Sequence, residues 1–180
     1  MTKSKGKNAT ILLVSGELDK AITAFEVALA LASMGEQVNM WFIFYGVNSI
    51  KKPQSLMRRF RKLFQKAQPA PGRVIETDLL LQRFIPFLNS SSNSMLPLSQ
   101  LNFLGLGSRF VKYIMRRKGA PSLEYLVKEA DSMGVTFKIC QPCVDILMID
   151  TEKDLMVKAE VSGVSSYAVD VSKSHYNVTY

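Results

Sequence analysis

The sequence is poor in the residues that most often carry metal and nucleophilic chemistry. Its 180 residues include two cysteines and one histidine, His175. Two cysteines cannot form the disulfide framework of a small secreted domain. Two thiols and one imidazole also fall short of a closed four-ligand zinc site, and no Ser-His-Asp arrangement or carboxylate pair stands out. We therefore expect His175 to be structural or exposed and expect no metal and no cofactor; a zinc site shared between subunits is an alternative.

Three further absences narrow the class of protein. No GxGxxG or Walker sequence is present, so no nucleotide phosphate loop is expected. Residues 1–8 are basic and polar and lack the apolar middle of a signal peptide, which predicts a cytoplasmic location. Residues 84–108 carry no charge, but Pro86, Pro97 and a run of serines argue against a membrane-spanning helix. The length and the 47% apolar content predict a single domain over 1–180.

Acidic residues are missing from one basic segment. Between Lys51 and Arg73 lie eight Lys or Arg and no Asp or Glu, which leaves 15 basic and 15 acidic residues elsewhere. The net charge of +8 is therefore a local feature, and a solvated cationic face is its simplest interpretation. Thiosulfate, an acidic carrier protein, nucleic acid and an anionic membrane are alternative partners. Phe60 and Phe64 fall on the apolar side of a predicted helix, so nucleic-acid binding is not expected.

What the sequence does contain is an alternation of buried strands and helices. Each expected strand is a short apolar run, and each expected helix has an apolar face. Such an alternation predicts a mainly parallel sheet with right-handed crossovers, and hence an α/β, flavodoxin-like open sheet flanked by helices. A basic helical insertion over about 51–119 interrupts it. The expected strands are 9–14, 38–45, 135–139 and 176–180, and the expected helices are 19–34, 54–67, 108–118, 123–133 and 165–172.

The two cysteines lie three residues apart, at the end of a predicted strand. Such a strand places Cys140 at the carboxyl edge of the sheet, where backbone N–H groups of a following turn or helix favour the thiolate. Lys138 would add positive potential if the strand is regular, and Asp145 is expected to cap a helix. Cys140 is therefore the candidate for chemistry. A thioredoxin-like redox pair, with only 37 residues after Cys143, and two buried structural cysteines are the alternatives.

Two turns follow the first and second predicted strands. Carboxyl ends of parallel strands meet at one edge of a sheet, so we expect these turns to lie beside Cys140. The candidate substrate pocket formed by them consists of Ser15, Gly16, Glu17, Tyr45 and Gly46.

Several segments together resemble the DsrE family of small sulfur-relay proteins. These segments are 11–21, 40–46 and 134–145, and the last of them contains Cys140. The likeness spans nearly the whole chain. The larger subgroup, labelled DsrE-like or peroxiredoxin-like, has an insertion with Asn-x-x-Gly-Leu-Gly before a basic helix, and 102–107 reads Asn-Phe-Leu-Gly-Leu-Gly. The turn 162–164 also fits. The chain is therefore similar to this subgroup.

The resemblance implies a parallel α/β homo-oligomer that acts as a sulfurtransferase-type sulfur carrier. Cys140 would hold a persulfide or thiosulfonate and pass sulfur to a TusA-like carrier or another thiol protein. Cys143 stands where the family pattern expects Met, Ser or Thr, and would either release sulfur by forming a disulfide with Cys140 or be an incidental core residue.

Two other functions are alternatives. The first is a non-catalytic oligomeric binding or membrane-peripheral module, in which the basic insertion makes a weak contact with an anionic membrane. The second is a peroxide-reducing enzyme, which has little support because the Thr-x-x-Cys surroundings of true peroxiredoxins are missing.

Overall fold

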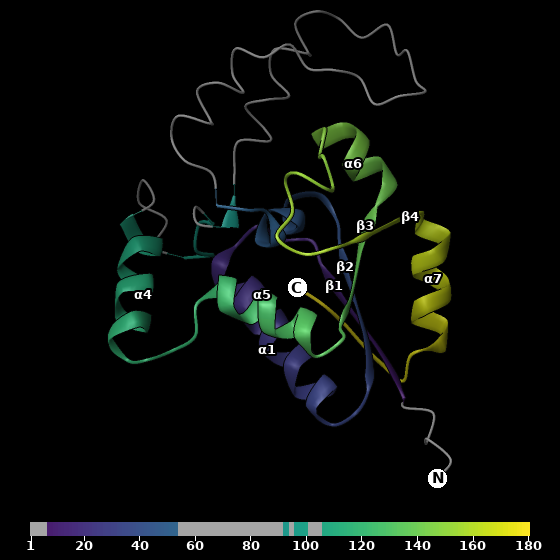
Figure 1. Ribbon diagram of the computed structural model, residues 1–180, viewed down its shortest axis with the longest axis horizontal. Coiled ribbons are helices and arrows are strands. Elements are labelled where there is room, and N and C mark those ends of the chain that lie inside the picture. The colour runs from purple at the N-terminus through teal and green to yellow at the C-terminus, as the bar shows by residue number, and fades with distance from the viewer. Residues whose placement is uncertain (1–6, 54–91, 94–95, 101–105) are drawn as a thin grey trace, which may run out of the picture.

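A computed structural model describes residues 7–53, 92–93, 96–100 and 106–180 (Figure 1). The expected helix 54–67 and most of the insertion lie outside these residues. Residues 102–105 of the Asn-x-x-Gly-Leu-Gly segment also lie outside them. Within them, five strands form one sheet. The strands are β1 (Asn8–Leu13), β2 (Gln37–Phe42), β3 (Thr136–Cys140), β4 (Glu160–Ser162) and β5 (Tyr176–Thr179).

The sheet is parallel throughout and has the order β4-β3-β2-β1-β5. The first strand, β1, pairs with the central strand β2 on one side and with the last strand, the edge strand β5, on the other. Alternating strands and helices produce this arrangement because parallel neighbours need a crossover connection. The predicted α/β, flavodoxin-like parallel sheet is confirmed.

Two helices cover one face of the sheet, α1 (Leu18–Ser33) and α5 (Leu123–Ser132) (Figure 1). The core on this face contains three aromatic rings, Phe25 of α1, Phe42 of β2 and Phe137 of β3. Their centroids lie 6.0 to 6.3 Å apart, and all three side chains are buried. The near-continuous apolar pattern of these elements therefore reflects a closely packed interior.

The other face is covered by α7 (Val164–Lys173), which has no fully buried residue. Its contacts with the sheet are partly polar. Trp41 of β2 donates its indole N–H to Asp170 at 2.9 Å, and Lys138 of β3 pairs with the same carboxylate at 2.8 Å. Tyr167 meets the Trp41 ring edge-on, with centroids 5.5 Å apart. A small polar network thus fixes α7 over the middle of the sheet.

The second strand is shorter than its sequence predicts. The apolar run continues to Tyr45, but β2 ends at Phe42 and a 3-10 helix, η1 (Phe44–Ile50), begins. Phe44 has a positive φ of 48°, which is uncommon for a residue with a Cβ and turns the chain out of the strand. The backbone N–H of Gly46 then donates to the carbonyl of Val14 at 3.0 Å, which holds η1 against the end of β1.

A short helix, α6 (Gln141–Leu147), follows β3, and α4 (Leu106–Arg117) is the described helix of the insertion. The N-cap of α6 is Cys140. The expectation that Asp145 caps a helix is wrong, because Asp145 lies inside α6 and accepts a hydrogen bond from the Gln141 side chain at 2.9 Å.

Candidate functional site

Cys140 is the last residue of β3 and the residue before α6. It pairs in register with Ser162 of the edge strand β4. Its side chain is only 4% exposed. The sequence-based placement at the carboxyl edge of the sheet therefore agrees with the structure, but the sulfur lies below the molecular surface. Small sulfur donors reach such a position more readily than a folded partner does.

Cys143 lies one turn further along α6, and its side chain is 2% exposed. Its sulfur accepts a hydrogen bond from the backbone N–H of Phe44 at 3.2 Å. Burial raises the pKa of the Cys143 thiol; the Phe44 N–H opposes this, and the adjacent Cys140 thiol raises the pKa further. Cys143 therefore stays protonated at neutral pH.

Lys138 does not supply free positive charge to Cys140. The strand is regular, so the two side chains lie on the same face as anticipated. However, the Lys138 ammonium is paired with Asp170 and lies over the Trp41 ring, 5.6 Å from its centre. The carboxylate offsets the charge of Lys138. The sequence did not indicate this pairing, because Asp170 is 32 residues away on α7.

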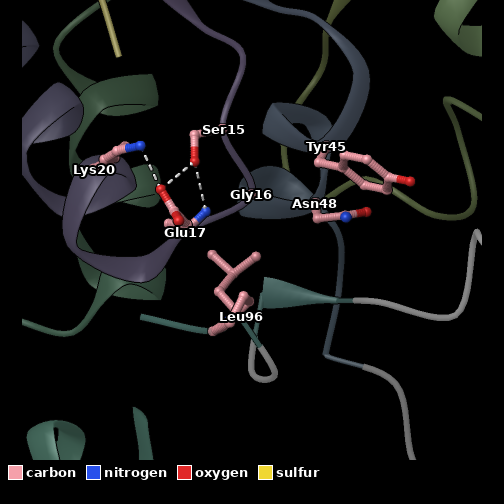
Figure 2. A pocket seen from close by; sticks show the side chains of 8 residues that line it. Ser15, Gly16, Glu17, Lys20, Tyr45, Asn48 and Leu96 are labelled. Carbon is pink, nitrogen blue, oxygen red and sulfur yellow. Dashed lines mark hydrogen bonds and ion pairs between the residues drawn. The ribbon is translucent and has the colours of Figure 1, made fainter. Parts of the chain in front are cut away.

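A cavity of about 430 Å³ opens at the same edge of the sheet, between the ends of β1 and β2. Figure 2 shows Ser15, Glu17 and Lys20 on one side of it and Tyr45 and Asn48 on the other. Of the five predicted pocket residues, Ser15, Gly16, Glu17 and Tyr45 line the cavity. The structure places Gly46 elsewhere, buried against β1. The lining residues that sequence reasoning missed are Lys20, Asn48, Leu96 and Pro97.

One wall of the cavity is a hydrogen-bonded cluster at the start of α1. Glu17 accepts a hydrogen bond from the Ser15 hydroxyl at 2.8 Å and pairs with Lys20 at 2.5 Å. These two contacts hold the pKa of Glu17 below its usual value, and the contact with Lys20 has the larger effect. The wall therefore carries an ionised carboxylate and an ammonium group. The three-residue spacing of Glu17 and Lys20 could have revealed this pair, because such residues are neighbours on a helix.

The opposite wall depends on a buried lysine. Lys51 is 1% exposed, and its ammonium donates to the side-chain oxygen of Asn48 at 2.8 Å. An ammonium group only donates, so the amide of Asn48 must turn its oxygen toward Lys51. Its NH₂ group is then left to donate in another direction. Lys51 thus fixes the orientation of the Asn48 amide in this wall of the cavity.

The floor of the cavity comes from a distant part of the chain. Pro97 accepts a hydrogen bond from the backbone N–H of Leu18 at 2.7 Å. The backbone N–H of Ser99 donates to Asp19 at 3.1 Å, and the Ser99 hydroxyl donates to the same carboxylate. Burial alone would raise the pKa of Asp19, but the hydrogen bonds from Ser99 outweigh it and lower the pKa. Segment 96–100 is thus fixed to the start of α1.

The thiols and the cavity are neighbours but not one site. Neither cysteine lines the cavity. The η1 turn connects them, because Phe44 contacts the Cys143 sulfur and the next residue, Tyr45, lines the cavity. A Cβ at Gly16 would lie 2.9 Å from the Cβ of Tyr45, so the two strand-end turns are packed as closely as glycine permits.

Neither a metal cluster nor a membrane span is found in the part of the chain that the structure describes. Within 7–53, 92–93, 96–100 and 106–180, no three His, Cys, Asp or Glu side chains are grouped to hold a metal ion. None of the helices in those ranges is long and apolar enough to cross a membrane.

Two known proteins are similar in sequence to this chain over most of its length. The chain is 26% identical over 175 residues to the uncharacterized protein YrkE of Bacillus subtilis, covering 96% of both chains. It is 28% identical over 140 residues to the sulfur carrier protein DsrE2 of Allochromatium vinosum, covering 78% of this chain and 77% of that protein.

A solved structure, that of the ychN protein from E. coli, has a similar fold. The TM-score is 0.52 at 10% identity, over 96% of this chain and 99% of that chain. Finally, the sequence model of the DsrE/DsrF/DrsH-like family matches residues 5–179. The chain therefore belongs to the DsrE/DsrF/DrsH-like family.

Proposed function

We propose that the protein is a sulfur carrier that holds sulfane sulfur on Cys140 and passes it to a thiol acceptor. Family membership and the similarity to a protein named as a sulfur carrier support a role in sulfur relay. The observation that carries the proposal is the position of Cys140 at the carboxyl end of β3, where it is the N-cap of α6. Cys143 lies inside α6, and its sulfur accepts the Phe44 backbone N–H at 3.2 Å, so Cys140 is the proposed nucleophile.

The loading step needs a thiolate and a donor with a weak S–S bond. With thiosulfate, the Cys140 thiolate attacks the outer sulfur, the S–S bond of thiosulfate breaks, and sulfite leaves with the electron pair. Cys140 then carries a persulfide. The cavity residues Ser15, Gly16, Glu17 and Tyr45 are proposed to hold the donor beside the thiols, to which η1 joins the cavity, before the donor reaches the Cys140 sulfur.

The unloading step reverses the roles of the sulfurs. The thiolate of an acceptor, such as a TusA-like protein, attacks the outer sulfur of the persulfide, and the Cys140 thiolate leaves. In this scheme Cys143 stays a thiol beside the reacting sulfur and is not itself loaded. Homo-oligomer formation and a cytoplasmic location remain predictions.

Intact-protein mass spectrometry tests the proposal. Reduced wild type, Cys140→Ser and Cys143→Ser would be incubated with thiosulfate, tetrathionate or polysulfide. We expect a thiol-reversible sulfur adduct on wild type and on Cys143→Ser, and none on Cys140→Ser with its fold intact. An adduct on Cys140→Ser, or no adduct from any donor, would overturn the proposal. Release of sulfide with formation of a Cys140–Cys143 disulfide would also contradict a carrier, because the sulfur would be reduced and not passed on.

A further inference from the structure

The helix α4 presents an outward face on which apolar and cationic side chains are mixed. Phe110, Tyr113 and Ile114 are 62%, 56% and 40% exposed. Their spacing of three and four residues places them together on one side of the helix. The opposite side of α4 contacts the protein, since Ser108 is buried and Val111 packs against the core. Within the part of the chain that the structure describes, the outward side is therefore apolar and uncovered.

Positive charge lies within and beside this exposed group. By helical spacing Arg117 falls among Phe110, Tyr113 and Ile114, while Arg109, Arg116 and Lys118 flank the group, and all four are exposed. Between Leu106 and Leu123 the sequence contains no Asp or Glu. Among the residues that the structure describes, no carboxylate pairs with any of these four cations. The guanidinium carbon of Arg117 instead lies over the aromatic ring of Tyr113, 5.5 Å from the ring centroid.

We infer that α4 docks the protein on the surface of an anionic lipid bilayer. Helices that lie in a membrane interface combine bulky apolar side chains with Lys and Arg. The apolar group Phe110, Tyr113 and Ile114 would enter the headgroup region, while the long arginine side chains extend sideways to lipid phosphates. The chemistry of the face thus matches a negatively charged, amphipathic partner.

The form of the face favours a bilayer over other anionic partners. A single-stranded nucleic acid needs several free ring faces for base stacking, whereas here Arg117 lies over the Tyr113 ring and Ile114 is aliphatic, which leaves the ring of Phe110. A partner protein would need a groove shaped to a convex helix with protruding side chains, whereas lipids rearrange around such a helix. In Figure 1, α4 lies on the opposite side of the molecule from α7, so docking there leaves the α7 side of the sheet uncovered.

Sedimentation with vesicles tests the inference on the full chain. We expect wild type to sediment with phosphatidylcholine vesicles containing phosphatidylserine, to remain in solution with phosphatidylcholine alone, and to be released by high salt. The double variant Arg109→Gln, Arg116→Gln should bind about 25-fold more weakly, at about fivefold per charge. Phe110→Ser should weaken binding about tenfold through its lost apolar contact.

A matched control distinguishes binding through the α4 face from a general effect of the protein's net charge. Lys158→Gln with Lys173→Gln removes two exposed charges elsewhere and should leave vesicle binding within twofold of wild type. Equal weakening by both double variants would overturn the inference, as would full binding by Phe110→Ser. Displacement of vesicles by a single-stranded oligonucleotide at equal phosphate concentration would point to nucleic acid instead and also overturn it. Because Cys140 has no part in this contact, Cys140→Ser should bind vesicles like wild type whether or not it accepts sulfur.

Discussion

The two faces of the sheet are held by different forces. On the α1/α5 face, Phe25, Phe42 and Phe137 form a fully apolar cluster. On the α7 face, one carboxylate, Asp170, joins an indole and an ammonium group under a helix with no fully buried residue. Apolar burial depends little on direction, whereas hydrogen bonds and ion pairs fix orientation. The first face therefore supplies most of the stability, and the second sets the position of α7.

The largest effect on stability is expected from the apolar face. Phe137→Ala would remove one ring of the cluster and leave a cavity, which costs about 3–5 kcal/mol of unfolding free energy. Urea unfolding followed by circular dichroism measures this. The matched control is Phe110→Ala on the exposed side of α4, which should change the free energy by less than about 0.5 kcal/mol. Equal losses for the two variants would show that the aromatic cluster is not the stabilising core.

A smaller effect is expected on the polar face. Asp170→Ala would leave the indole N–H of Trp41 and the ammonium of Lys138 without their acceptor, at a cost of about 1–3 kcal/mol. Trp41 is the sole tryptophan of the sequence, so its fluorescence should shift to the red as α7 loosens.

Asp131→Ala, at an exposed position of α5, is the control for Asp170→Ala and should leave both stability and fluorescence unchanged. If Asp170→Ala cost as much as Phe137→Ala, the contrast between the faces would be lost.

The smallest effect concerns ionisation at the edge of the sheet. In Cys140→Ser, alkylation of Cys143 by iodoacetamide should reach half of its maximal rate at a pH above the ordinary cysteine value, because burial raises the pKa of Cys143. Urea-unfolded Cys140→Ser should give a midpoint near about 8.5. The stability that comes from the neutral thiol is complete below the unfolded pKa and is lost as the pH rises through the folded one. Identical midpoints for folded and unfolded protein would contradict this assignment.

Much of the fold follows from local sequence, because buried strands and apolar helices leave strong patterns. The expected strand at 9–14 and helix at 19–34 lie within one residue of β1 and α1. The short edge strand β4 was missed, since three residues with no buried side chain give no apolar run. The expected strand end at Tyr45 was wrong, because the turn depends on the backbone of Phe44 and on the approach of Gly46 to β1.

The candidate site was partly predictable for the same reason. The position of Cys140 and four of the cavity residues follow from where strands end. The partner of Lys138 and the floor formed by Leu96 and Pro97 do not, because these contacts join segments far apart in the chain. The state of Cys143 also depends on a neighbour, Phe44, almost a hundred residues earlier.

The approach of Gly46 to β1 has a consequence for the descent of such proteins. A Cβ at position 46 would overlap the carbonyl oxygen of Leu13, and that oxygen also accepts the backbone N–H of Ile43 at 3.1 Å. The strand cannot withdraw without losing this bond, so the position admits a single amino acid. Gly46 is therefore required by the architecture itself, and a chain with this fold is expected to keep glycine there whatever its chemistry.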